Sequence, residues 1–250
     1  MNVGPVSQDR SRSARCTVTT SWDDGHRLDV ELADLLERHG IAGTFYIAPR
    51  NHEIDPHQRL GPAGIRELAQ CFEIGAHTLS HQRLSRLPDA RAAQEMRAGK
   101  QELEEITGSA VTSFCYPCGD YRPVHLRQAR ELGFSLARTV RRGYLDPGAP
   151  LELRTTVNAY AHRVDALASL RMARLRPRVA GRLYLDWDEL AISWFERCLG
   201  QGGVYHLWGH SWEVAARGDW QRLERVLAHI GGRPGVRYLA NGQLIGGRAN

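Results

Sequence analysis

Short apolar runs alternate with helical patterns along most of this chain, and this alternation constrains the fold more than any other feature. The first unit joins an apolar, β-branched run at residues 16–21 to leucines at helical spacing from Leu28 to Leu36, which end before Gly40. Repeated strand–helix units imply a parallel sheet, because parallel strands are joined by crossover helices. We therefore expect an α/β protein that forms one domain with a closed or nearly closed barrel.

The same patterns predict the remaining elements. Strands are expected at residues 16–21, 43–48, 72–76, 111–116, 134–139, 151–157, 203–208 and 236–239. Helices are expected at residues 28–40, 62–70, 89–106, 123–132, 165–175, 187–199 and 219–230. Residues 1–15 are polar and predict a flexible N-terminal tail, which leaves residues 16–245 for the barrel domain. In such barrels the active site lies at the C-terminal ends of the strands.

Composition argues against two classes of partner. The formal net charge is +5, but the arginines that supply most of the positive charge are scattered, so we expect no nucleic-acid binding. No stretch resembles a signal-peptide core or is apolar enough to span a membrane, so we expect a cytoplasmic protein without membrane insertion. Five cysteines in such a chain predict free thiols, including Cys115 and Cys118.

Two adjacent carboxylates, Asp23 and Asp24, follow the first expected strand, and Gly25 comes directly after them. Like charges this close repel each other and push their pKa values apart, unless a cation lies between them or one stays protonated. A metal site that uses one aspartate as a ligand and the other as a base accounts for the pair. An ordinary Asp-Asp-Gly turn is the competing interpretation.

Two histidines, His77 and His81, follow the third expected strand. If a helical turn begins there, their spacing puts both imidazoles on one face. Two neutral histidines and one carboxylate form a ligand set that suits zinc, iron or cobalt and leaves positions open for water and substrate. Paired surface histidines are the alternative, but this pair ends a strand on the same barrel face as Asp23 and Asp24. The sequence therefore predicts a divalent metal site at this face.

Four segments carry these and other polar residues in order: residues 20–25 (TSWDDG), 77–81 (HTLSH), 114–119 (FCYPCG) and the segment around His210. They resemble, in the same order, the first, second, third and last motifs of the polysaccharide deacetylase superfamily (carbohydrate esterase family 4, the NodB-like deacetylases). The resemblance extends over residues 17–211. It implies a distorted (β/α) barrel, a divalent metal ion and hydrolysis of an N-acetyl or related acyl group.

Carried over position by position, the resemblance gives Asp24, His77 and His81 as metal ligands and Asp23 as the general base. A metal ion lowers the pKa of its water from 15.7 toward about 7, so a nearby carboxylate can deprotonate that water for attack on the amide carbon. Zinc is the expected ion, with cobalt, iron, manganese and nickel as alternatives.

Amide cleavage also needs an oxyanion hole and an acid. The resemblance assigns the backbone N–H of Cys118 to the oxyanion hole, which is worth roughly 3 kcal/mol of transition-state stabilisation. His210 is the expected acid because it follows the apolar strand at residues 203–208. His206 is the second choice, since a buried, hydrogen-bonded histidine is expected there. Glu213 or Asp219 would orient His210.

The chain departs from the family pattern in its third motif. The family offers an arginine that pairs with the base aspartate, and Cys115 occupies that position here. Arg154, on a later expected strand, could supply the missing guanidinium from another direction, and an ordinary surface arginine is the alternative. Trp208 and Trp212 flank His210, so one of them could stack on a sugar ring, with plain packing as the alternative.

The expected function is the metal-dependent removal of an N-acetyl or N-formyl group from an amino sugar in an intracellular saccharide, glycan precursor or natural product. Ring opening of a cyclic amide and O-deacetylation by the same site are alternatives. A deacetylase-like binding protein with impaired catalysis is a further alternative, because Cys115 replaces the family arginine.

Overall fold

The structure is a computed structural model that describes residues 16–161, 181 and 186–246. The tail expected at residues 1–15 and the helix expected at residues 165–175 lie outside the described residues. No helix in the described part of the chain is both long enough and apolar enough to cross a lipid bilayer.

In the described part of the chain, one curled sheet of eight strands forms the centre of the molecule, and every strand pairing in it is parallel. The strand order is β5-β4-β3-β2-β1-β7-β6, and β8 pairs with β1. The strands are β1 (Cys16–Asp24), β2 (Gly43–Ile47), β3 (Glu73–Ala76), β4 (Ser113–Cys115), β5 (Leu136–Arg138), β6 (Val157–Asn158), β7 (Gly203–Gly209) and β8 (Val236–Tyr238). The expected α/β fold of one domain is confirmed.

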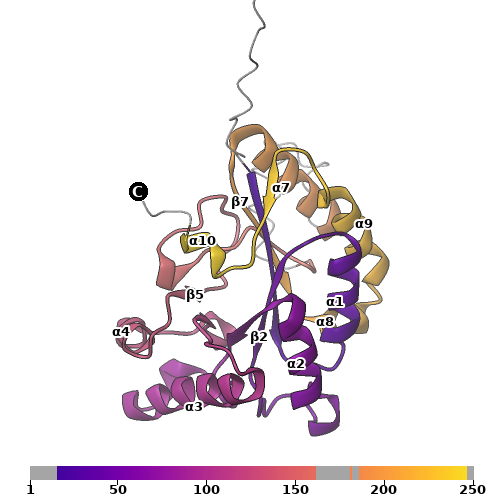
Figure 1. Cartoon of the computed structure of the whole chain (residues 1–250). Coiled ribbons are helices and arrows are strands. Elements are labelled where there is room, and N and C mark those ends of the chain that lie inside the picture. The colour runs from indigo at the N-terminus through magenta and orange to yellow at the C-terminus, as the bar shows by residue number, and fades with distance from the viewer. Residues whose placement is uncertain (1–15, 162–180, 182–185, 247–250) are drawn as a thin grey trace, which may run out of the picture.

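Helices connect the strands and cover the outside of the curled sheet (Figure 1). They are α1 (Asp29–Arg38), α2 (Pro62–Cys71), α3 (Asp89–Thr107), α4 (Pro123–Glu131), α7 (Trp187–Gln201), α8 (Ser211–Arg217), α9 (Trp220–Ile230) and α10 (Gln243–Gly246). The helix α8 was not expected from the sequence; it begins directly after β7 and His210. On α7, Trp187 and Trp194 are buried in the core.

The strand β1 lies in the middle part of this sheet, and Figure 1 shows it in indigo through the centre of the molecule. One of its edges pairs with β7, while the other edge is shared by β8 near its start and β2 near its end. All nine of its residues are buried. Because side chains alternate along a strand, Val18 and Trp22 pack into the apolar core, whereas Ser21 and Asp23 lie on the opposite face. Ser21 Oγ there lies 2.8 Å from His206 Nε2, so this second face is polar.

Residues 153–158 contact both ends of the curled sheet. Leu153 forms a single bridge with Arg138 of β5, and Val157 pairs with Leu207 of β7. The strand expected at residues 151–157 is therefore mostly an extended crossing, preceded by a 3-10 turn at Pro150–Glu152 and ending in the short β6. It pairs with each neighbour over only one or two residues because it crosses from one sheet end to the other.

Candidate active site

The predicted metal ligands Asp24, His77 and His81 meet at the C-terminal ends of β1 and β3. Their ligand atoms all lie within 4.8 Å of one another, and all three side chains are buried. Asp24 Oδ1 lies 3.3 Å from His81 Nε2 and 3.8 Å from His77 Nε2. Asp24 thus turns one oxygen toward both imidazoles.

Backbone strain is concentrated at this site. Among the described residues, the non-glycine positions with left-handed φ angles are Asp24 (86°), Thr78 (62°), His81 (63°) and Cys118 (56°). Such angles are uncommon for residues with a Cβ atom and cluster at functional sites. At Asp24 the left-handed angle ends the strand, so its side chain leaves the alternation that Asp23 still follows.

The two histidines converge through a turn, and the helical turn expected at residues 77–81 is wrong. Thr78 and His81 have left-handed φ angles, which an α-helix does not allow. The turn is stabilised by the buried Glu95 of α3, whose Oε2 accepts hydrogen bonds from the Ser80 hydroxyl at 2.8 Å and the Ser80 N–H at 3.0 Å. His81 N–H also donates to Thr78 Oγ1 at 3.0 Å.

The protonation and orientation of His77 suit a metal ligand. Its Nδ1 lies 2.8 Å from the backbone carbonyl of Cys115 and donates to it, which leaves Nε2 unprotonated toward Asp24. Burial, reinforced by the nearby His81, lowers the pKa of His77 to about 4, so the ring is neutral at physiological pH. Neutral imidazole is the form that binds divalent ions.

The two oxygens of Asp24 have different surroundings, which tests whether a divalent ion fits here. Oδ2 accepts a hydrogen bond of 2.9 Å from the indole N–H of Trp212. Oδ1 is buried and has no hydrogen-bond partner among the described residues. A buried carboxylate oxygen without a donor is costly unless a cation compensates it. One carboxylate oxygen and two neutral imidazoles fit zinc or a similar ion, with open positions for water and substrate.

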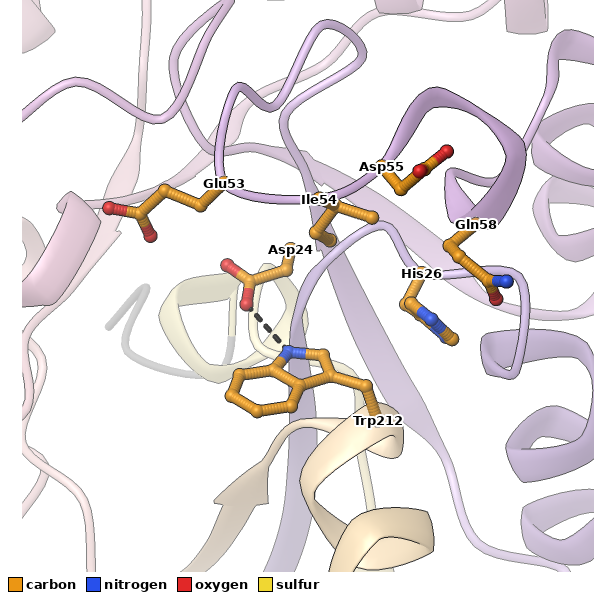
Figure 2. A pocket seen from close by; sticks show the side chains of 7 residues that line it. All are labelled: Asp24, His26, Glu53, Ile54, Asp55, Gln58 and Trp212. Atoms are coloured by element: carbon orange, nitrogen blue, oxygen red, sulfur yellow. Dashed lines mark hydrogen bonds between the residues drawn. The ribbon is translucent and has the colours of Figure 1, made fainter.

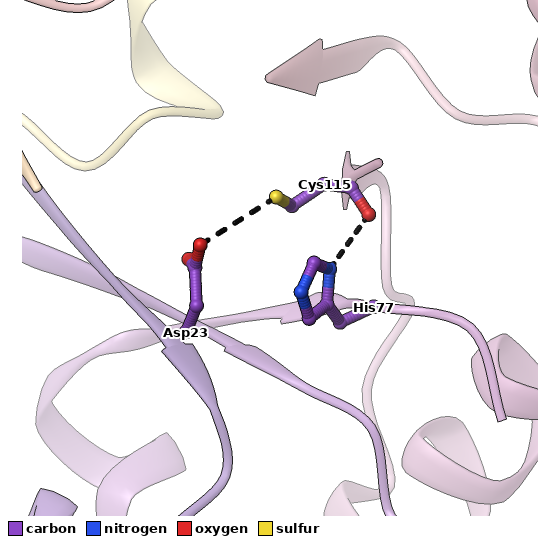
Figure 3. A group of neighbouring side chains, drawn as sticks. All are labelled: Asp23, His77 and Cys115. Atoms are coloured by element: carbon purple, nitrogen blue, oxygen red, sulfur yellow. Dashed lines mark hydrogen bonds between the residues drawn. The ribbon is translucent and has the colours of Figure 1, made fainter. Parts of the chain in front are cut away.

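A second group of potential ligands, Asp23, His77 and Cys115, lies beside the first (Figure 3). Cys115 Sγ is 3.8 Å from Asp23 Oδ2. Burial raises the pKa of the Cys115 thiol well above its usual range, so the sulfur keeps its proton. Asp23 is already paired with the guanidinium of Arg138. A cation is therefore favoured at the group that contains Asp24.

Arg138 at the end of β5 forms a buried ion pair with Asp23, with its Nη2 hydrogen-bonded to the carboxylate. The guanidinium carbon lies 4.5 Å from the centre of the Trp208 ring and 5.4 Å from that of Tyr46. Burial alone would raise the pKa of Asp23, but the charge of Arg138, with the nearby histidines, outweighs it and lowers the pKa. Asp23 is therefore ionised, as a general base must be.

The expectation that Arg154 could supply the missing guanidinium is wrong. Arg154 forms an exposed ion pair with Asp146 at 3.2 Å and lies over the ring of Tyr144. Arg138 makes the contact with Asp23 because it is the register partner of Cys115 on the neighbouring parallel strand. An arginine within the strand expected at residues 134–139 was the sequence signal that could have identified it, because arginine is rarely found inside a buried strand.

His210 lies beside Asp24 and is oriented by Glu213. Its Nδ1 is 2.8 Å from Glu213 Oε2, and its Nε2 is 3.9 Å from Asp24 Oδ2. Burial alone would lower the pKa of His210, but the hydrogen bond to Glu213 and the charges of Asp24 and Asp23 raise it to about 9. His210 is therefore protonated at neutral pH, as an acid must be.

The competing residues have other partners. Burial lowers the pKa of His206 to about 3, and its ring is hydrogen-bonded to Ser21, so it is a neutral interior histidine. Asp219 accepts a hydrogen bond from the Trp187 indole at 3.1 Å, which leaves Glu213 as the partner of His210.

The remaining predicted site residues differ in exposure. Trp208 is 4% exposed and covered by Arg138, so it packs in the interior and cannot stack on a sugar. Trp212 is 38% exposed. Cys118 is exposed in the turn after β4, and both Cys118 and Cys115 are free thiols.

A pocket of about 320 Å³ opens beside Asp24. We call it the Trp212 pocket; it is lined by Asp24, His26, Glu53, Ile54, Asp55, Gln58 and Trp212. Figure 2 shows the loop that carries Glu53 and Asp55 on one side of Asp24 and Trp212 on the other. Because Asp24 belongs both to the pocket and to the ligand group, the pocket leads directly to the site of chemistry.

Comparison with known proteins agrees with this arrangement. The family model for polysaccharide deacetylase matches residues 10–137, more than half of the 250-residue chain. No curated protein matches the sequence. A candidate polysaccharide deacetylase from Mycobacterium smegmatis has a similar structure, with a TM-score of 0.67 at 15% identity over 99% of this chain and 94% of that one.

Two further structures are similar. The chitin deacetylase from the fungal pathogen Colletotrichum lindemuthianum gives a TM-score of 0.62 at 18% identity, over 93% of this chain and 88% of that one. The Streptococcus pyogenes deacetylase PplD, in complex with acetate, gives a TM-score of 0.50 at 21% identity, over 54% of this chain and 62% of that one. That match spans less than two thirds of the streptococcal chain. These likenesses show the deacetylase fold, and the family match shows that the chain belongs to the polysaccharide deacetylase family.

Proposed function

We propose that the protein is a metal-dependent hydrolase that removes an N-acetyl or N-formyl group from an amino sugar. The observation that supports this most is the convergence of Asp24, His77 and His81 within 4.8 Å, next to an ionised Asp23 and a protonated His210. Family membership supports the deacetylation, and the site supports its division into ligands, base and acid.

Asp24, His77 and His81 would hold the ion. When bound, the ion polarises the acyl carbonyl and lowers the pKa of a water molecule toward neutrality. Asp23 accepts the proton of the attacking water, and Arg138 keeps its carboxylate ionised and fixed in position. Because Arg138 is buried, this ion pair is only weakly screened by solvent.

His210 donates a proton to the leaving amine of the sugar. Glu213 holds its Nδ1, so that Nε2 faces the site and carries the proton to be transferred. The backbone N–H of Cys118 is the proposed donor to the developing oxyanion, and the left-handed conformation of Cys118 supports a specialised role for that turn. Trp212 supplies an exposed aromatic surface against which a sugar ring could stack.

The direct test is an assay of acetate and formate release from a panel of N-acylated amino sugars, with metal removal by EDTA and add-back of zinc or cobalt. We expect release that EDTA abolishes and metal restores. Asp23→Asn should retain the metal and lose activity. Ring opening of a cyclic amide, or release from O-acetyl substrates alone, would replace the proposed reaction with another one at the same site.

A further inference from the structure

The described lining of the Trp212 pocket includes three carboxylates. Asp24 is 6% exposed, and its Oδ1 has no hydrogen-bond partner among the described residues. Glu53 and Asp55, from the loop after β2, also line the pocket, and Figure 2 shows their side chains on opposite sides of Ile54. A divalent ion at Asp24 would offset the charge of that carboxylate, while Glu53 and Asp55 would stay anionic.

Among the described residues no lysine or arginine lines this pocket, although the whole chain has a net charge of +5. Glu53 Oε2 is 2.9 Å from His81 Nδ1, but the geometry is not that of a hydrogen bond, and Nδ1 has no hydrogen-bond partner among the described residues. The Glu53 side chain is 55% exposed. Asp55 Oδ1 accepts a hydrogen bond of 2.8 Å from the backbone N–H of His57, two residues away. Neither carboxylate is neutralised by an arginine or lysine of the lining.

Trp212 forms the wall opposite these carboxylates (Figure 2). It is one of two large hydrophobic side chains that are exposed in the described part of the chain, and the other, Tyr144, is covered by the guanidinium of Arg154. A sugar ring on the indole could direct its acyl carbonyl toward Asp24 and its other substituents toward the loop that carries Glu53 and Asp55.

We propose that the Trp212 pocket selects a cationic amino sugar, in which a free ammonium group accompanies the acylated amine. This inference rests on the proposed deacetylase function and narrows its substrate class. Glu53 and Asp55 attract the ammonium group, whereas a phosphate or pyrophosphate in the same position is repelled. Saccharides that already carry a free amine are therefore preferred over fully acylated or phosphorylated ones.

Equilibrium binding to the zinc-loaded full chain carrying Asp23→Asn, which should hold the metal without hydrolysing the ligands, tests this preference, and acetate release is measured with the wild-type chain. The ligands are N,N′-diacetylchitobiose, its two mono-N-acetyl forms with one free amine, and N-acetylglucosamine 1-phosphate, measured by calorimetry at about pH 6.5, where an amine is protonated. We expect at least one mono-N-acetyl form to bind roughly three- to tenfold more tightly than the diacetyl form, the scale of exposed charge pairs. This advantage should shrink as salt is added.

Asp55→Asn is the decisive variant, because asparagine preserves the cap on the 3-10 turn and removes only the charge. It should reduce the advantage of the mono-N-acetyl form over the diacetyl form. Glu53→Gln should act similarly, with metal content measured because of its contact with His81. Asp34→Asn is the matched control, since Asp34 is exposed on α1 and does not line the pocket.

Equal or tighter binding of the diacetyl form, or an undiminished advantage in a metal-loaded Asp55→Asn protein, would overturn the inference. Tighter binding of the phosphate would overturn it as well. Acetate release from the same ligands is measured separately. If no ligand releases acetate, the proposed function fails, and the binding comparison still decides what the pocket selects.

Discussion

Arg138 is the register partner of Cys115 on the neighbouring parallel strand, and its guanidinium forms a buried ion pair with Asp23. The position where the family has an arginine is thus occupied by a thiol, while the guanidinium comes from the next strand. Both side chains lie near the same carboxylate in the interior of the sheet. Cys115 Sγ is 3.8 Å from Asp23 Oδ2. The contact that the family motif would make is preserved by a residue outside the motif.

Replacing Arg138 by glutamine should lower kcat/KM at pH 7 by roughly a hundredfold, within the range of general-base catalysis. The charge of Arg138 holds the pKa of Asp23 below its usual range. Without it the pKa rises, so the acidic limb of the kcat/KM profile should move to higher pH. A profile measured from pH 4 to 8 on folded protein checks this. An unmoved acidic limb would show that Arg138 does not act on the base.

Cys115, the register partner of Arg138, allows an experiment that restores the lost guanidinium. The double variant Arg138→Gln/Cys115→Arg should recover part of the activity and return the acidic limb toward its original pH, because either residue can direct a guanidinium toward Asp23. Arg154→Gln is the control and should retain wild-type kinetics, since Arg154 pairs with Asp146 at the surface. Activity loss in Arg154→Gln and none in Arg138→Gln would reverse the assignment.

Glu213→Gln should move the basic limb of the same profile to lower pH. His210 acts as an acid below its pKa, which the hydrogen bond to Glu213 helps to raise to about 9 against the effect of burial. Loss of the carboxylate charge lowers that pKa, so less of His210 is protonated at pH 8, and we expect about a tenfold loss there. Asp219→Asn should leave this limb in place.

Asp29→Asn should stabilise the protein at alkaline pH. Asp29 is buried at the start of α1, and burial raises the pKa of its carboxyl to about 8 from an ordinary 3.8, although the Ser211 hydroxyl donates to Oδ1 at 2.5 Å. The folded state therefore binds a proton that the unfolded state has lost between these two values, so stability falls as pH rises through that window.

The measurement is the difference in Tm between Asp29→Asn and wild type at pH 5 and pH 8. We expect the variant to gain at least a few degrees relative to wild type between the two pH values, roughly what 1 kcal/mol provides. Asp34→Asn, exposed on the same helix, should show no such gain. A constant difference across the two pH values would mean that Asp29 does not titrate as described.

Most of the fold could be predicted from the sequence, because most strands are short runs of apolar or β-branched residues and many helices have leucines at helical spacing or a clear end signal. The predictions failed where tertiary contacts determine the secondary structure. Residues 151–157 contain the apolar positions of a strand, yet they cross between two sheet ends and pair only briefly. Helix α8 is short and follows His210 directly, so its periodicity was too weak to detect.

The residues of the candidate site that lie within the sequence motifs could be predicted. Asp23, Asp24, His77 and His81 are close in sequence to the strand ends that bring them together. The partner of Asp23 could not be predicted in this way, because strand register determines which arginine reaches it, and the chain contains many arginines. Likewise, nothing in the sequence distinguishes Trp208, which lies beneath Arg138, from Trp212, which faces the pocket.

The different roles of the two adjacent aspartates are the centre of this account, and one paired measurement tests them. Metal content and acetate release are measured for wild type, Asp24→Asn and Asp23→Asn after incubation with zinc. We predict one bound ion and activity in wild type, loss of both in Asp24→Asn, and retention of the ion with a roughly hundredfold or greater loss of activity in Asp23→Asn. Wild type that binds no divalent ion, or an Asp23→Asn protein that loses the ion while Asp24→Asn keeps it, would contradict the account.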